Sequence, residues 1–129
     1  MYKRQGWYLN YRSTENIDHP SGVEFVPVIR LSQTSETGFS YTPNGAALKN
    51  AILAHPGARW LIGNEPDRRT SIQDNVEPHI YAAAYHELYQ VIKQTDPTAR
   101  IVAGTIVQPT PLRLRYLDMV LASYHQTFG

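Results

Sequence analysis

The chain has 129 residues, 42% of them hydrophobic, and a formal net charge of +1, which suits one domain with a modest core. Lys and Arg are scattered, so the clustered basic face of a nucleic-acid-binding protein is not expected. No membrane partner is expected either. The absence of cysteine excludes disulfides and thiolate metal sites. No apolar run is long enough to span a bilayer, and residues 1–9 lack the apolar segment of a signal peptide. The sequence therefore leaves the localisation open, and an extracellular location would require a longer precursor.

The predicted elements alternate between strands and helices. In chain order they are a strand at 6–11, a loop at 12–22, a strand at 23–31, a loop at 32–45, a helix at 46–55, a strand at 58–64, a loop at 67–77, a helix at 78–94, a strand at 99–107 and a helix that begins at 111. The second strand is nearly continuous in apolar residues, and Pro27 indicates a bulge or an irregular pairing within it. This order predicts a parallel sheet with right-handed crossovers, although the first loop is too short for a crossover helix.

The third strand ends in an amide and a carboxylate, in the sequence WLIGNEPD at residues 60–67. Pro66 cannot donate to a ladder and biases Glu65 away from helix, so we expect the strand to stop at Asn64 and Glu65. In parallel α/β folds, this end of a strand carries ligands and catalytic groups. Glu65 and Asn64 are therefore candidate site residues. On spacing alone, a loop carboxylate without chemistry is the alternative.

Three stretches together resemble the successive strand motifs of a glycoside hydrolase barrel: WYLNY at 7–11, EFVPV at 24–28 and LIGNEPD at 61–67. They are most similar to the Asl1-like glycosyl hydrolase catalytic core, the group that includes family 128 endo-β-1,3-glucanases. More broadly, the motif NEP at 64–66 is similar to the acid/base strand of clan A retaining glycosidases. The resemblance covers most of this chain but only the front part of a (β/α)8 barrel. It implies a single partial TIM-barrel domain over residues 1–129, with about four parallel strands, flanking helices and a carbohydrate substrate.

The resemblance also implies roles for single residues. Glu65 matches the general acid/base, and Asn64 matches the amide that hydrogen-bonds the sugar 2-hydroxyl. A retaining glycosidase needs a second carboxylate about 5 Å away as nucleophile. No carboxylate after Glu65 ends a later strand in this sequence. The nucleophile is therefore expected to be absent, and hydrolysis by this chain alone is expected to be weak or missing.

Weaker candidates lie at or near other strands. Arg30 matches the arginine that clan A enzymes often hold near the nucleophile, and a surface arginine is an equal alternative. Asn10 and Gln108 are candidates to contact sugar hydroxyls, although a strand-end polar side chain facing water is the simpler interpretation. Trp7 is a candidate to stack on a sugar ring, whereas the position of Trp60 early in its strand favours core packing.

No metal or cofactor is expected. The five histidines show no metal-ligand spacing, and no glycine-rich loop of the kind that holds phosphates is present.

Four parallel strands make about half of a (β/α)8 barrel, which typically has ~250 residues. An open half leaves unpaired sheet edges and exposes apolar side chains that a closed barrel would cover. We therefore expect the chain to be a fragment, or to pair with another copy through its open sheet edges. Two non-enzymatic alternatives stay open: a carbohydrate-binding remnant and a half-barrel that assembles with a partner chain.

Overall fold

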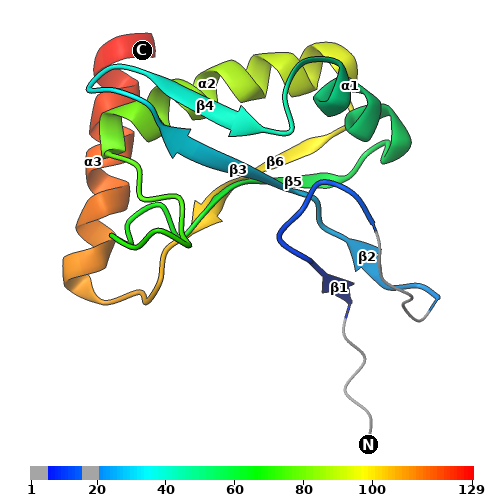
Figure 1. The fold of residues 1–129 in the computed structure, drawn as a ribbon, viewed down its shortest axis with the longest axis horizontal. Helices are drawn as coiled ribbons and strands as arrows, with labels where there is room; N and C mark the ends of the chain where they lie inside the picture. Colours follow the sequence, from blue (N-terminus) through cyan, green and yellow to red (C-terminus); the bar gives the residue numbers. More distant parts are fainter. Residues whose placement is uncertain (1–5, 16–20) are drawn as a thin grey trace, which may run out of the picture.

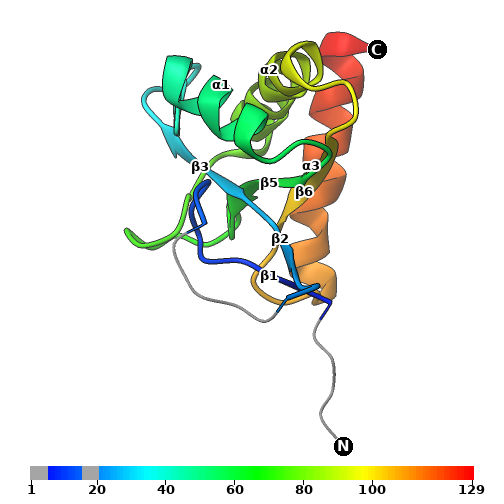
Figure 2. The ribbon, with the colours of Figure 1, turned by 90° about the vertical axis from the view of Figure 1, so that its right-hand side faces the viewer.

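The computed structural model describes residues 6–15 and 21–129 (Figures 1 and 2). The elements are β1 (Trp7–Tyr8), β2 (Glu24–Phe25), β3 (Val28–Gln33), β4 (Phe39–Thr42), α1 (Gly45–Ala54), β5 (Arg59–Asn64), α2 (Pro78–Thr95), β6 (Arg100–Thr105) and α3 (Pro111–Phe128). They form a small sheet, β1-β2, and a larger one in the order β4-β3-β5-β6. Helices α1 and α2 lie on one side of the larger sheet, β1 and β2 lie toward the other side, and α3 lies beside α2 (Figures 1 and 2). No described helix is long and apolar enough to cross a membrane.

The parallel arrangement predicted from the sequence is confirmed for most of the sheet. β3 runs parallel to β5, with Val28 opposite Leu61, and β5 runs parallel to β6, with Trp60 opposite Ile101. β1 and β2 are also parallel. α1 follows the hairpin of β3 and a further strand, α2 follows β5, and the apolar positions of both helices recur at helical spacing and pack in the core. α3, which follows β6, packs against α2.

The prediction of a loop over residues 32–45 is wrong in its second half, because residues 39–42 form β4. This strand folds back on β3 in antiparallel register, with Phe39 opposite Gln33 and Thr42 opposite Arg30. The rings of Phe39 and Tyr41 are half-buried and pack against the core, whereas Ser40 and Thr42, which alternate with them, are exposed. One edge of the larger sheet is therefore an antiparallel hairpin strand rather than a parallel strand.

The strand predicted at 23–31 is divided at Pro27, which confirms the irregular pairing expected there. Before the break, the N–H of Val26 donates to the carbonyl of Tyr8 at 2.9 Å. After it, the carbonyl of Pro27 accepts the N–H of Leu61 at 3.0 Å. The chain thus changes its strand partner from β1 to β5 at the residue that has no N–H to donate. The first strand is also shorter than predicted, since only Trp7 and Tyr8 are in β1.

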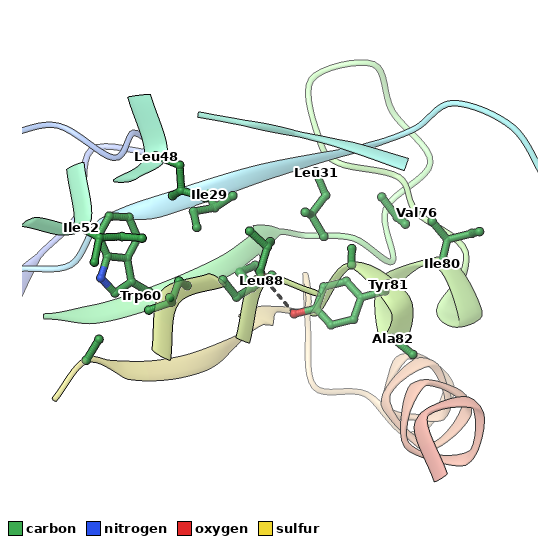
Figure 3. Close-up of a cluster of buried hydrophobic side chains, with 14 of the residues drawn as sticks. Ile29, Leu31, Leu48, Ile52, Trp60, Val76, Ile80, Tyr81, Ala82 and Leu88 are labelled. Carbon is green, nitrogen blue, oxygen red and sulfur yellow. Dashed lines mark hydrogen bonds between the residues drawn. The ribbon is translucent and has the colours of Figure 1, made fainter. Parts of the chain in front are cut away.

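The main core lies between the sheet and the helices α1 and α2 (Figure 3). Trp60 is fully buried there, which confirms its predicted packing role. Its neighbours in the cluster include Ile29, Leu31, Leu48, Ile52, Ile62, Ile80 and Leu88. A smaller cluster covers the opposite face of the sheet and consists of Val26, Val28 and Leu61, with Leu9 packed against it. This second face is the less covered one.

The far edge of the sheet is open within the described part of the chain. β6 pairs with β5 alone, and the side chain of Val102 on it is 43% exposed. The neighbouring helix α3 buries only Val120 among its residues. An edge strand with exposed apolar residues is a surface on which another strand can pair.

Candidate functional site

The site begins where β5 ends. β5 stops at Asn64, as Pro66 predicted, so Asn64 and Glu65 lie at the carboxyl end of a parallel strand. The pairing with β6 skips one residue there, because Ile62 is opposite Ala103 and Asn64 is opposite Thr105. Gly63 takes up the irregularity with a φ of +77°. The pairing is thus interrupted at Gly63, directly before the amide and the carboxylate.

Glu65 has a backbone conformation that is uncommon for a residue with a side chain. Its φ is +45°, and its N–H donates to the carbonyl of Thr105 at 2.9 Å. Backbone strain of this kind often occurs at functional sites, where the surrounding structure enforces it. The side chain is 24% exposed, and its Oε2 lies 3.4 Å from Nη1 of Arg68. Glu65 is therefore a partly buried carboxylate, fixed at the rim of the sheet, with one adjacent cation.

Asp74 organises the rim from the loop that follows β5. Its side chain is fully buried between β3 and β5. Its Oδ2 accepts the N–H groups of Leu31 at 2.9 Å and of Asn64 at 2.7 Å, and its Oδ1 accepts from Nε of Arg30 at 2.5 Å. The regular pairing of β3 with β5 covers only residues 28–29 and 61–62. The carboxylate therefore replaces the ladder where the two strands separate.

Asn64 and Arg30 both contact the loop at 66–77. The side chain of Asn64 is buried, and its Nδ2 donates to Oε1 of Gln73 at 2.5 Å. Arg30 pairs with Asp74, and its Nη2 also donates to the carbonyl of Ile72 at 2.9 Å. The structure thus places both predicted residues beside the segment that carries Glu65, with their polar atoms bonded to loop residues.

Asp67 connects the same loop to the next βα unit. Its buried carboxylate accepts from Nη1 of Arg113 at 2.7 Å and from the N–H of Val107 at 3.2 Å. Gln108 follows Val107 and is exposed, and its carbonyl accepts the N–H of Thr110 at 2.7 Å, just before α3 begins. The segment that carries Gln108 is therefore held to the loop after Glu65 through Asp67.

Trp7 and Asn10 lie elsewhere. Trp7 is 50% exposed and pairs with Glu24, whose side chain lies 3.4 Å from Arg59, the first residue of β5. A strand of six residues rises ~20 Å, so Trp7 lies near the opposite end of β5 from Glu65. Asn10 closes its own loop, because its Oδ1 accepts the N–H of Arg12 and its Nδ2 donates to the carbonyl of Thr14. Trp7 is therefore away from Glu65, and these two bonds of Asn10 lie within its own loop.

Several residues that hold the rim were not identified as site residues from the sequence. They are Arg68, Gln73, Asp74, Asp67 and Arg113. Only Arg68 had a local signal, because it lies three residues after Glu65. Asp74 is 44 residues from Arg30, and no short-range pattern relates the two. Within residues 6–15 and 21–129, no three His, Asp or Glu side chains are placed to hold a metal ion.

No protein-family model matches this sequence, and neither does any curated protein. The fold defines the chain as an α/β half-barrel, and a comparison with solved structures agrees. It matches the crystal structure of a GH128 (subgroup III) curdlan-specific exo-β-1,3-glucanase from Blastomyces gilchristii in complex with glucose, with a TM-score of 0.62 and 24% identity. The match covers 93% of this chain and 47% of that chain, so this chain spans about half the length of the glucanase. The fold predicted from the sequence motifs, a partial (β/α)8 barrel resembling family 128, is confirmed.

Proposed function

We propose that this chain is a glycoside hydrolase-like domain that acts on the O-glycosidic bonds of a β-glucan, with Glu65 as the acid/base. The observation that carries the proposal is the position of Glu65, directly after a parallel strand, partly buried and held with a positive φ. The matched enzyme is described as specific for curdlan, a β-1,3-glucan, and was crystallised with glucose. A β-1,3-linked glucan is therefore the first substrate to test.

In the proposed reaction, the carboxyl group of Glu65 donates a proton to the leaving glycosidic oxygen. Asn64 hydrogen-bonds the sugar 2-hydroxyl. To do so, its amide must break the hydrogen bond to Gln73 and form one to the substrate. Gln108 is exposed on the segment tied to this loop and is a candidate to contact sugar hydroxyls. Arg30 supports the rim through Asp74 rather than by a free guanidinium. Trp7 and Asn10 have no role in this proposal.

The retaining mechanism requires a second carboxylate as nucleophile. Asp67 and Asp74 follow Glu65 most closely in the chain, but Asp67 is paired with Arg113 and Asp74 accepts three hydrogen bonds. Neither is free to attack an anomeric carbon. We infer that the chain described here needs a nucleophile from elsewhere, so its own turnover is weak or missing.

An external nucleophile tests Glu65 directly. Azide at high concentration is added to the protein with 4-methoxyphenyl β-glucoside or a short β-1,3-glucan, and the glycosyl azide is measured. Because a poor leaving group needs a proton, Glu65→Gln should strongly reduce the azide-dependent release of the leaving group and the formation of the glycosyl azide. Glu36→Gln, at an exposed turn, is the matched control and should leave the rate unchanged. Equal rates in wild type and Glu65→Gln would remove Glu65 from the mechanism. Glucan binding without any azide-dependent release would favour the carbohydrate-binding alternative.

A second candidate is a half-barrel that assembles with another chain, and the exposed Val102 on the open strand β6 favours it. Light scattering after size-exclusion chromatography should then show association that rises with concentration. Val102→Lys should reduce it, because edge lysines oppose strand pairing. Leu53→Lys, on the exposed side of α1, should not. A compact monomer at all concentrations would count against this assembly.

A further inference from the structure

A groove begins at Pro66 and Asp67, directly after Glu65, and runs between the loop after β5 and the helix α3. One part of it has a volume of about 320 Å³ and is lined by residues that include Arg69, Glu77, Arg115 and Met119. A second part, of about 400 Å³, adjoins it, and both parts share Leu112 and Tyr116 in their walls. These volumes match small-molecule sites in size.

The floor of the groove is held by a hydrogen bond, a ring contact and an ion pair. The hydroxyl of Tyr116 donates to the carbonyl of Val76 at 2.7 Å. The ring of Tyr116 lies edge-on to the ring of Tyr81, with 6.3 Å between the ring centroids. Beside it, the ion pair of Asp67 with Arg113 fixes α3 to the loop. A ligand that enters the groove would therefore meet a preformed aromatic surface, so little ordering of the protein would oppose its binding.

The wall on the α3 side is apolar and uncovered. Leu112 is 74% exposed and Met119 is 56% exposed, and both border the groove together with the ring of Tyr116. Single exposed apolar side chains are common on protein surfaces, but here two of them adjoin an aromatic ring in one hollow. The apolar part of a ligand would find its contacts here.

The charges of the groove leave one guanidinium without a partner. Arg113 is neutralised by Asp67, and Arg69 lies 3.8 Å from Glu77. Arg115 is exposed, borders the groove and has no ion pair in the described part of the chain. A guanidinium binds a carboxylate through two parallel hydrogen bonds, whereas Glu77 nearby disfavours an anion of higher charge.

We propose that this groove binds a small organic monocarboxylate with an apolar or aromatic body. Arg115 takes the carboxylate, and Leu112, Met119 and Tyr116 take the apolar body. The site holds whether or not Glu65 takes part in hydrolysis, because none of these side chains contributes to the rim around Glu65.

The test is titration of the whole chain with 3-phenylpropionate. Binding is measured by calorimetry and by the NMR shifts of the Met119 and Leu112 methyl groups. The neutral isostere 3-phenylpropanamide and inorganic phosphate serve as comparison ligands. Loss of a hydrogen bond between charged groups lowers affinity by about tenfold or more, so the amide should bind at least that much more weakly. Phosphate lacks the apolar body that Leu112, Met119 and Tyr116 would contact, so it should also bind more weakly. The methyl groups of Met119 and Leu112 should shift on binding.

Two variants measure the contributions of the Arg115 charge and of the apolar wall to binding separately. Arg115→Gln and Leu112→Ser should each weaken 3-phenylpropionate binding. Arg100→Gln on β6 and Leu53→Ser on α1 are matched exposed controls that should leave it unchanged. The proposal is overturned if 3-phenylpropionate does not bind, if the amide or phosphate binds as tightly, or if the variant Arg115→Gln binds it normally. Shifts confined to methyl groups outside α3 in the wild-type protein would also overturn it, without reliance on any variant.

Discussion

Asp74 accepts the backbone N–H of Asn64 at 2.7 Å, so a loop carboxylate fixes the last residue of β5. The same side chain accepts the N–H of Leu31 on β3 and pairs with Arg30. Two N–H groups that lose their ladder partners where the strands separate are thereby satisfied. The geometry of Asn64 and Glu65 therefore depends on a residue that takes no part in the proposed chemistry.

Replacement of Asp74 by alanine should destabilise the protein strongly. It leaves two buried N–H groups without their acceptor and removes the carboxylate that pairs with Nε of Arg30, which we expect to cost about 3–5 kcal/mol in the free energy of unfolding. Urea denaturation followed by circular dichroism measures this. Asp118→Ala, on the exposed face of α3, is the control and should change stability by less than about 0.5 kcal/mol. A loss below about 1 kcal/mol in Asp74→Ala would show that water replaces the carboxylate.

Tyr81 joins β5 to β6 through its hydroxyl. The hydroxyl donates to the carbonyl of Ile62 at 2.7 Å and accepts the N–H of Gly104 at 2.6 Å (Figure 3 shows the buried ring). Tyr81→Phe leaves both backbone groups unpaired in the core, so it should lower the unfolding free energy by about 1–3 kcal/mol. Tyr89→Phe, at a partly exposed position of the same helix, should change it by less than about 0.5 kcal/mol. Equal stability of the two variants would contradict this role.

Gly63 cannot carry a side chain without crowding the rim. A Cβ there would lie 3.2 Å from Oδ2 of Asp74 and from the ring of Tyr81, at a φ of +77°. Gly45 also has a positive φ, of +50°, but a Cβ there would meet open space. Gly45→Ala should therefore cost only the backbone strain, about 1–2 kcal/mol. Gly63→Ala should cost about 1–3 kcal/mol more. Chemical denaturation of the two variants gives their unfolding free energies, and the difference measures the cost of crowding at Gly63. Equal losses of stability would show that the rim adjusts to a Cβ at Gly63 without cost.

Asp96 should make stability fall in acid. Hydrogen bonds from the Thr98 side chain and from the N–H of Gly57 lower the pKa of Asp96 below its ordinary value of 3.8. The unfolded chain therefore binds this proton more readily, so the contribution is complete above pH 3.8 and is lost as pH falls toward the lowered pKa. The stability difference between wild type and Asp96→Asn should shrink from pH 6 to pH 3. A constant difference for Asp96→Asn would contradict the assignment.

Long elements with clear periodicity were predictable from the sequence. The helices α1 and α2 and the strand β5 begin and end close to the predicted residues, because Pro and Gly mark their limits. The strand β4 was missed, because two aromatic residues alternating with two hydroxyl residues give too short a pattern between turn-forming residues.

The position of Glu65 was predictable because Pro66 ends the strand locally. The partners that shape the rim were not, because they meet only after folding. Arg30 and Asp74 are 44 residues apart, and Asp67 and Arg113 are 46 residues apart. Trp7 pairs with Glu24 near the start of β5, so it lies away from the rim.

The loop after β5 is tied in two directions, by Asp67 to α3 and by Asp74 to β3. A shift of α3 would therefore act on the loop after Glu65 through the ion pair of Asp67 with Arg113. Because α3 leaves most of its surface uncovered, a molecule bound to this helix would contact an element that is ion-paired to the loop after Glu65.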